Sequence, residues 1–198
     1  MRKHVTVGQT LRECCIKPMQ IHLVRHCSTE FNADGRLRGW MDPPLSMQGL
    51  KEARALARPS GALYCSDLLR ARMTAVFLGT AAPKFELRPW HIGEFAGQKG
   101  VHEQLVELQK TNGTPPGGEP YIEFVERFLG FVCSLYEPSV LVTHFRNLKL
   151  MQAWVAADCE GLDWDVLLSN NVETGSTFAF DLRSDLILDL RSILFNTA

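Results

Sequence analysis

The chain has 198 residues, of which 45% are hydrophobic and 22% charged, and its formal net charge is −1. This length and composition are typical of one globular domain with a sizeable core. With so little net charge we expect no nucleic-acid partner and no membrane partner. No apolar run reaches the roughly 18 residues that a membrane-spanning helix needs.

The first 18 residues are charged and contain no apolar stretch of the kind found in a signal peptide. We interpret residues 1–18 as an N-terminal extension and residues 19–198 as the main domain. The six cysteines show no CxxC pair and no metal-ligand spacing. That pattern is typical of reduced thiols, so the expected location is the cytoplasm.

An apolar run at residues 21–24 predicts a buried strand, which ends in Arg25 and His26. The carboxyl end of a strand is where ligands bind in open α/β sheets. An isolated Arg-His pair would more often be an ordinary surface pair. A loop rich in glycine and proline follows, and Ser46 is suited to cap the next helix.

Residues 62–65 predict a second buried strand. We expect Ser66 or Asp67 to cap the helix that follows it, whose first turn contains Arg70. If the strands are parallel, Arg70 lies near the same sheet edge as His26, although an exposed helical arginine is the usual alternative. Residues 84–88 predict a third, shorter strand.

The second half of the chain continues the alternation of helices and strands. The expected elements are an irregular loop at 89–97, helices at 99–111 and from 119 onward, a strand at 139–143 that ends in His144, another helix, and late strands at 176–180 and 186–188. Such alternation predicts an α/β fold with a largely parallel sheet covered by helices on both faces.

Four basic residues should meet at one edge of this sheet. His26 and His144 each end a strong strand, and Arg25 and Arg70 lie beside them. One guanidinium group can bind two phosphate oxygens at once. A neutral imidazole can attack phosphorus, while a protonated one stabilises the charge of the transition state. These residues therefore predict phosphoryl transfer through a histidine.

Five motifs between residues 21 and 180 occur in the order found in a known family. They are Arg25-His26-x-x-Thr29-x-x-Asn32, Asp42-Pro43-Pro44-Leu45-Ser46-x-x-Gly49, Ser66-Asp67-Leu68-x-Arg70-Ala71-x-x-Thr74-Ala75, Pro116-Gly117-Gly118-Glu119 and Val142-Thr143-His144. This ordered set resembles the histidine phosphatase superfamily, which includes the cofactor-dependent phosphoglycerate mutases. The fourth motif resembles a loop common in its phosphatase branch.

The resemblance implies a three-layer α/β/α sandwich and a covalent phosphohistidine on His26, with no metal and no organic cofactor. It also implies that Arg25, Arg70 and His144 surround the phosphoryl group and that Asn32 holds one of its oxygens. The candidate substrate-binding residues are Asn32, Thr29, Arg38 and Arg146.

Two departures from the family pattern concern the residues that follow the histidines. Glycine normally follows the first histidine, and here it is Cys27, which we expect to crowd the pocket. Two glycines normally follow the second histidine, and here they are Phe145 and Arg146. Phe145 should narrow the entrance, and Arg146 adds a charge that can meet the tail of the substrate.

A third departure affects the general acid. The family spacing places Pro89 where a glutamate usually stands, and a positioned acid is typically worth a rate gain of about 10²–10⁴-fold. The nearby substitutes are Glu86, His91 and Glu94, of which we favour Glu94. For each of them a loop residue with no catalytic role is the alternative.

The sequence therefore predicts a phosphohydrolase that acts on a small phosphorylated molecule through His26. A protein phosphohistidine phosphatase becomes more attractive if no substitute acid exists, because that leaving group departs more easily. A catalytically impaired phosphate-binding or regulatory protein is the alternative from another class. Mutase activity is less favoured, because 198 residues leave little room for the insertions that mutases use around a second phosphate.

Overall fold

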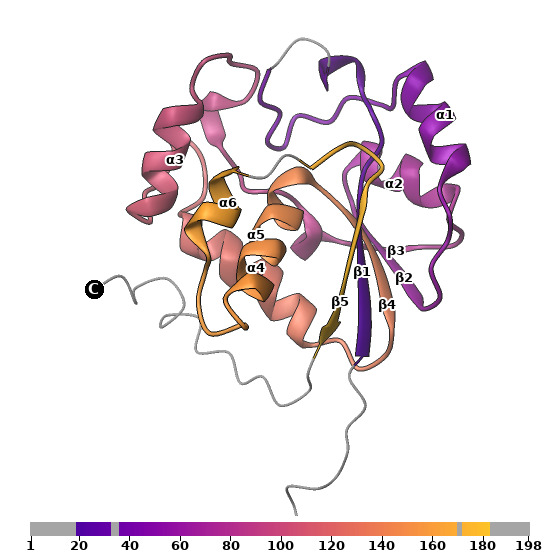
Figure 1. Cartoon of the computed structure of the whole chain (residues 1–198). Coiled ribbons are helices and arrows are strands. Elements are labelled where there is room, and N and C mark those ends of the chain that lie inside the picture. The colour runs from indigo at the N-terminus through magenta and orange to yellow at the C-terminus, as the bar shows by residue number, and fades with distance from the viewer. Residues whose placement is uncertain (1–18, 33–35, 170–171, 183–198) are drawn as a thin grey trace, which may run out of the picture.

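The computed structural model describes residues 19–32, 36–169 and 172–182. Within them one sheet has the strand order β3-β2-β4-β1-β5. Its strands are β1 (Met19–Arg25), β2 (Ala62–Ser66), β3 (Ala82–Lys84), β4 (Ser139–Thr143) and β5 (Thr177–Leu182). The first four pair in parallel, and β5 runs antiparallel to β1 at the edge (Figure 1). The predicted α/β fold with a largely parallel sheet is confirmed.

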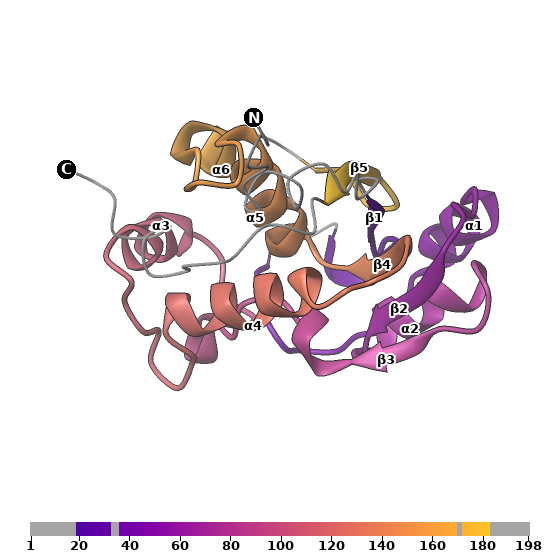
Figure 2. The ribbon, with the colours of Figure 1, turned by 90° about the horizontal axis from the view of Figure 1, so that it is seen from below.

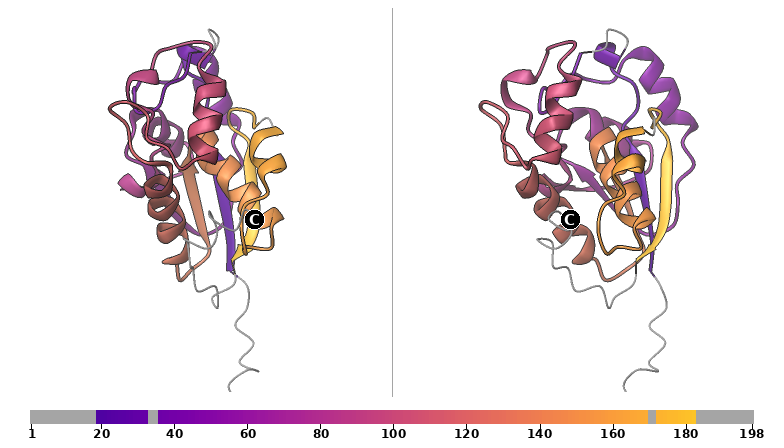
Figure 3. Two further views of the ribbon diagram at one scale, coloured as in Figure 1. Left: turned by 90° about the vertical axis from the view of Figure 1, so that its left-hand side faces the viewer. Right: turned by 60° about the vertical axis from the view of Figure 1, so that its left-hand side comes forward.

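Helices cover both faces of this sheet. They are α1 (Met47–Ala55), α2 (Leu69–Val76), α3 (His102–Lys110), α4 (Tyr121–Cys133), α5 (Phe145–Ala156) and α6 (Trp164–Ser169). Figure 2 shows α1 and α2 on one side of the strands and α4, α5 and α6 on the other, with α3 farther out on that second side. The views in Figure 3 show the layer of α3 to α6 lying over the sheet. No helix in the described ranges is long and apolar enough to cross a membrane.

The two central strands bury side chains on both faces. In β1, Ile21 and Leu23 join the large core beneath α4 and α5, whereas Val24 joins a smaller core beneath α2. In β4, Leu141 faces the large core and Val142 the smaller one. Successive strand residues point to opposite faces, so these continuous apolar runs fit the middle of a covered parallel sheet.

Helix α1 begins where the sequence predicts. The Ser46 hydroxyl accepts a hydrogen bond from the Gly49 backbone N–H at 3.0 Å, so Ser46 is the N-cap. Gly49 is needed for a different reason, because a Cβ atom there would lie 2.0 Å from the Ser28 carbonyl oxygen. Helix α1 therefore packs directly on the loop that follows His26.

The predicted cap of helix α2 is wrong. Neither Ser66 nor Asp67 binds its first turn; instead the Leu69 N–H donates to Asp42 Oδ2 at 2.6 Å. Asp67 is occupied by Arg88, whose Nε and Nη2 donate to its two carboxylate oxygens at 2.7 and 2.9 Å. Asp42, which is distant in the sequence, thus takes the capping role that was predicted for Ser66 or Asp67.

The strand predicted at residues 84–88 is also wrong, because β3 ends at Lys84 and Phe85–Leu87 forms a 3-10 turn. The turn carries the chain over the sheet edge, where the Thr143 hydroxyl donates to the Leu87 carbonyl at 2.8 Å. Helix α6 was not expected from the sequence. The extension at 1–18 and the strand at 186–188 lie outside the described residues.

Candidate active site

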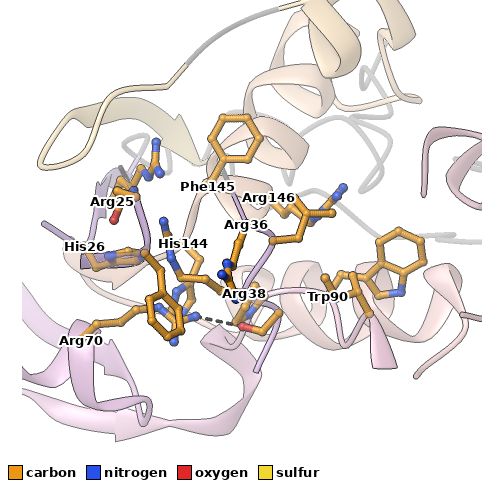
Figure 4. Close-up of a pocket in the computed structure, with 15 residues that line it drawn as sticks. Arg25, His26, Arg36, Arg38, Arg70, Trp90, His144, Phe145 and Arg146 are labelled. Atoms are coloured by element: carbon orange, nitrogen blue, oxygen red, sulfur yellow. Dashed lines mark hydrogen bonds between the residues drawn. The ribbon is translucent and has the colours of Figure 1, made fainter. Parts of the chain in front are cut away.

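A pocket of about 300 Å³ opens at the carboxyl edge of the sheet. Its lining comes from the ends of β1 and β4, the starts of α2 and α5, and the segments around residues 31–32, 36–39 and 89–92. The lining residues are Arg25, His26, Phe31, Asn32, Arg36, Leu37, Arg38, Gly39, Arg70, Pro89, Trp90, Ile92, His144, Phe145 and Arg146. Figure 4 shows His26 and Arg70 at one end of this pocket and Trp90 at the other.

His26 is held in a single orientation at the end of β1. Its backbone N–H donates to the Thr143 carbonyl at 2.9 Å, and its Nδ1 lies 2.8 Å from the Cys27 carbonyl. A carbonyl can only accept a hydrogen bond, so Nδ1 carries the hydrogen. The lone pair of the neutral ring therefore resides on Nε2.

His144 follows β4 and begins helix α5. Its ring meets that of His26 edge to face, with centroids 5.1 Å apart and an angle of 60° between the planes. Both ring nitrogens of His144 are buried without a hydrogen-bond partner in the described chain. Buried polar atoms are normally bonded, so these two nitrogens are suited to contact a ligand.

Both histidines are neutral in the free pocket. Burial, together with the nearby Arg70 guanidinium, holds the pKa of His26 well below 6.5. Burial and Arg70 have the same effect on the pKa of His144, and His26 adds to it. A neutral imidazole at neutral pH is the state that a nucleophile requires.

Arg70 is fixed inside the protein by the segment before helix α1. Its Nη1 donates to the Met41 carbonyl at 2.7 Å and lies 3.3 Å from Asp42 Oδ1, and its Nη2 donates to the Gly39 carbonyl at 3.0 Å. The side chain is only 2% exposed. Burial lowers the pKa of Arg70 to about 10, so it stays charged at neutral pH.

Arg25 lines the pocket beside His26. Its Nη1 donates to the Val172 carbonyl, and its guanidinium lies 5.1 Å from the centre of the Phe145 ring. Burial, followed by repulsion from Arg38, lowers its pKa to about 10. Arg25 and Arg70 therefore provide two fixed positive charges around the histidine pair.

Asn32 and Thr29 have different positions. The Asn32 side-chain oxygen accepts hydrogen bonds from the Thr29 N–H at 2.8 Å and from its hydroxyl at 2.9 Å. The Asn32 amide N–H₂ is thereby left for the pocket that this residue lines. Thr29 is buried behind it and is not a lining residue, so its placement indicates that it orients Asn32 instead of touching substrate.

A family model, described as the histidine phosphatase superfamily (branch 1), matches residues 21–173. The chain belongs to this superfamily. A 2,3-bisphosphoglycerate-dependent phosphoglycerate mutase of Beijerinckia indica is 27% identical in an alignment that is 202 residues long, gaps included. The alignment covers 87% of this chain and 96% of the mutase. A metal-independent phosphoserine phosphatase of Arabidopsis thaliana is 31% identical over 129 residues, or 54% of each chain.

The solved structure of a phosphoglycerate mutase from Thermus thermophilus has the same fold, with a TM-score of 0.68 and 36% identity. The match covers 82% of this chain and 93% of that one. Because relatives called mutases match over nearly their whole length, the length of this chain does not argue against mutase activity. The superfamily relatives include both mutases and phosphatases.

The residue that replaces the superfamily's glycine does not crowd the pocket, so that expectation is wrong. The Cys27 side chain is fully buried among Leu45 and Ala53 on the side of α1. Its backbone does not have a positive φ, and its N–H donates to the Thr74 hydroxyl at 3.0 Å. Phe145, in contrast, does line the pocket, as expected.

The favoured acid, Glu94, is not brought to the pocket. Its side chain is exposed, and its backbone N–H donates to the Pro116 carbonyl at 2.9 Å. At the preceding Gly93, which has a φ of +50°, a Cβ would lie 2.0 Å from the same carbonyl. Gly93 and Glu94 thus pack closely on Pro116 and lie outside the pocket lining. Three other residues of the same loop do belong to the lining, namely Pro89, Trp90 and Ile92.

The other two substitutes are also absent from the lining. His91 stacks on Trp40 with ring centroids 4.1 Å apart, and Glu86 lies in the 3-10 turn. Pro89 itself does line the pocket. No aspartate or glutamate is found among the lining residues that the structure describes. No cluster of three or more His, Cys, Asp or Glu in the same residues could hold a metal ion.

Three of the four predicted substrate-binding residues line the pocket, namely Asn32, Arg38 and Arg146. The sequence reading missed Arg36, Phe31, and the wall made by Trp90. Phe31 lies in a single 3-10 turn, and Arg36 and Trp90 lie in irregular segments, so no periodicity in the sequence marks which of these side chains point inward. In the sequence, the one feature that could have pointed to Arg36 as a pocket residue is its position two residues before Arg38.

Proposed function

We propose that this chain is a phosphohydrolase that removes a phosphoryl group from a small phosphorylated molecule through a covalent phosphohistidine on His26. The orientation of the His26 ring is the observation that supports this most. The hydrogen bond from Nδ1 to the Cys27 carbonyl, at 2.8 Å, leaves the Nε2 lone pair available in a ring that lines the pocket.

The reaction has two displacements at phosphorus. In the first, the Nε2 lone pair of His26 forms an N–P bond while the P–O bond to the leaving group breaks and that oxygen keeps the electron pair. In the second, a water oxygen forms a P–O bond and the N–P bond breaks, returning the pair to Nε2. One proton of the water stays on the product, HPO₄²⁻, and the other passes to solvent, which balances the proton that the released leaving-group oxygen takes up from solvent.

The neighbouring side chains stabilise the charge that moves in these steps. Arg25 and Arg70 stay positive in the pocket and match the phosphoryl oxygens. His144 is neutral before substrate binds, but a phosphate dianion beside it favours its protonated form. Once protonated, it can donate to a phosphoryl oxygen with one of its unbonded nitrogens.

The lining favours substrates with a good leaving group. A carboxylic acid that donates a proton to the leaving oxygen is missing from the described part of the lining. Aryl phosphates, acyl phosphates and phosphohistidine need little protonation when they leave. The chain should therefore hydrolyse activated phosphoryl compounds faster than simple alkyl esters.

A second candidate function is mutase activity. The similarity to the Beijerinckia indica mutase favours it, because this chain matches 96% of the length of that mutase. The same phosphohistidine would then pass its phosphoryl group to a substrate hydroxyl instead of water. The two activities differ in the acceptor. Release of inorganic phosphate, measured beside isomerisation of phosphoglycerate, distinguishes them.

The test is turnover of p-nitrophenyl phosphate, whose leaving group barely needs an acid. We expect the wild-type chain to release nitrophenol and phosphate, and His26→Gln to be inactive. His22→Gln is the matched control, because His22 lies on the same strand and contacts Gln20 outside the pocket. A wild-type chain without turnover, or a His26→Gln chain that keeps it, would contradict the proposal.

A further inference from the structure

Arg146 is, like Arg25, an arginine of this pocket without a carboxylate partner among the described residues. It lies in the first turn of α5 and is partly buried. Its guanidinium lies 5.4 Å from the centre of the Trp90 ring, and its Nη1 donates to Gln109 Oε1 at 3.2 Å. Both of these partners are uncharged.

Three other buried or partly buried arginines of the described chain have carboxylate partners. The pairs are Arg70 with Asp42 at 3.3 Å, Arg88 with Asp67 at 2.7 Å, and Arg127 with Glu119 at 2.7 Å. Arg146 makes no such pair within the described residues. Burying a charge without a counter-ion is costly, so the position is one that an anion would stabilise.

The hydrogen bonds of Arg146 leave one edge of its guanidinium unoccupied. Only Nη1 has an acceptor among the described residues, so the edge formed by Nε and Nη2 makes no hydrogen bond to that part of the chain. That edge can bind two oxygens of a carboxylate or a phosphate at once. Trp90 and Gln109 hold the side chain in place before any ligand arrives.

The position of Arg146 separates it from the phosphoryl site. Figure 4 shows it at the Trp90 end of the pocket, with His26 and Arg70 at the opposite end. All four residues line the same cavity of about 300 Å³. One small molecule can therefore reach both ends.

We infer that Arg146 binds a second anionic group of the substrate, a carboxylate or a second phosphate, while the transferred phosphoryl group lies at His26. The inference rests on the proposed function and names its substrate class: small, doubly anionic phosphorylated compounds. Phe31, Ile92 and Phe145 supply the apolar lining for the short stretch of substrate between the two anions.

Burial lowers the pKa of Arg146, and the nearby Tyr121 acts in the opposite direction. A bound anion would act in the opposite direction and favour the charged guanidinium. The electrostatics of the empty site thus agree with the geometry.

The test uses phosphonates, which bind but are not hydrolysed. We would measure Kd by calorimetry for para-carboxybenzylphosphonate, for its neutral isostere para-carbamoylbenzylphosphonate, and for para-xylylene bisphosphonate. We expect at least one of the doubly anionic compounds to bind the wild-type chain about tenfold or more tighter than the amide. Which one does so identifies the second group as carboxylate or phosphate.

Three variants make the result specific. Arg146→Gln should remove the tighter binding of the doubly anionic compound. Arg146→Lys should keep part of it, because lysine retains the positive charge but cannot form the bidentate hydrogen bonds of a guanidinium. Arg54→Gln, an exposed substitution on α1, makes the same charge change elsewhere and should keep the preference. Equal thermal stability of the wild-type chain and Arg146→Gln shows that the fold is intact, and equal Kd values of the two chains for the amide show that the phosphoryl site is intact.

Equal Kd values for the amide and both doubly anionic compounds in the wild-type chain would overturn the inference, as would a preference that survives in Arg146→Gln. Either result leaves the proposed hydrolysis standing if p-nitrophenyl phosphate is still turned over. A binding preference without any turnover would instead support the anion site and contradict the hydrolase.

Discussion

Asp42 binds both Arg70 and the first turn of the helix that carries Arg70. Its Oδ1 lies 3.3 Å from Arg70 Nη1, and its Oδ2 accepts the Leu69 N–H at 2.6 Å. A single carboxylate thus caps helix α2 and fixes the guanidinium that lines the pocket. This explains in physical terms why an aspartate stands in the loop after the first histidine.

Asp42→Ala should remove both contacts. We expect the free energy of unfolding to fall by about 1–2 kcal/mol, the usual cost of a lost N-cap, and the kcat/KM for p-nitrophenyl phosphate to fall as Arg70 loosens. Asp42→Asn keeps an oxygen for the cap and should lose less stability. Urea unfolding of the two variants checks this, and equal losses would argue that the cap is not the source of the effect.

The stability of the free protein should decline below pH 6.5. Burial holds the pKa values of His26 and His144 well below 6.5 in the folded state, whereas in the unfolded chain they return toward that value. Below pH 6.5 the unfolded chain therefore binds protons that the folded chain does not, and stability is lost as the pH falls. Above pH 6.5 these two groups should contribute no pH dependence.

Urea midpoints measured from about pH 8 to about pH 5 test this linkage. The double variant His26→Gln, His144→Gln is the control, and its midpoint should fall less over the same range. Inorganic phosphate should reduce the decline in the wild-type chain, because a bound dianion favours a protonated imidazole. A wild-type decline no steeper than that of the double variant would contradict the buried neutral histidines.

Arg127 should hold the pocket wall that contains Pro89. From α4 its guanidinium donates to a series of backbone carbonyls and to one carboxylate. The acceptors are the carbonyls of Phe85 at 3.3 Å, Glu86 at 3.0 Å, Arg88 at 3.1 Å and Pro89 at 3.5 Å, and Glu119 Oε1 at 2.7 Å.

Arg127→Met would leave the partly buried carboxylate of Glu119 without its partner, so we expect a loss of unfolding free energy on the order of 3 kcal/mol. Because Pro89 belongs to the segment that Arg127 binds and Trp90 follows it, and both line the pocket, kcat/KM should fall as well. Glu119→Gln keeps an oxygen for Arg127 and for the His91 N–H, which donates to it at 2.8 Å. This milder variant should lose less unfolding free energy. An Arg127→Met chain as stable as the wild type would show that the hydrogen bonds of Arg127 do not contribute to stability.

Hydrolysis should depend strongly on the leaving group. With no carboxylic acid in the described lining, alkyl phosphates should react about 10²–10⁴-fold more slowly than p-nitrophenyl phosphate, the range that a positioned acid supplies. Glu94→Gln should leave both rates unchanged, because Glu94 is exposed outside the lining. A selective loss of alkyl phosphate hydrolysis in this variant would return Glu94 to the role of acid.

Features with a local cause were predictable from the sequence. Apolar runs located β1, β2 and β4, and the Ser46 cap follows from its hydroxyl three residues before Gly49. The meeting of His26, His144 and Arg70 follows from parallel strands, whose carboxyl ends share an edge.

Features set by tertiary contacts were not predictable. The cap of α2 comes from Asp42, 27 residues before Leu69, and nothing near Leu69 in the sequence indicates it. The direction of Cys27 depends on α1 packing behind it. Glu94 has the right position in the sequence for an acid, yet the docking of its loop on Pro116 leaves its side chain in solvent.

The most direct test of the account is to trap the phosphoryl group on the protein. After brief incubation with a radiolabelled phosphoryl donor and denaturation, the wild-type chain should carry label that is labile in acid and stable in alkali, as a phosphohistidine is. The peptide that contains His26 should hold this label, and His26→Gln should hold none. Label that survives in His26→Gln, or that is stable in acid, would contradict a phosphohistidine on His26.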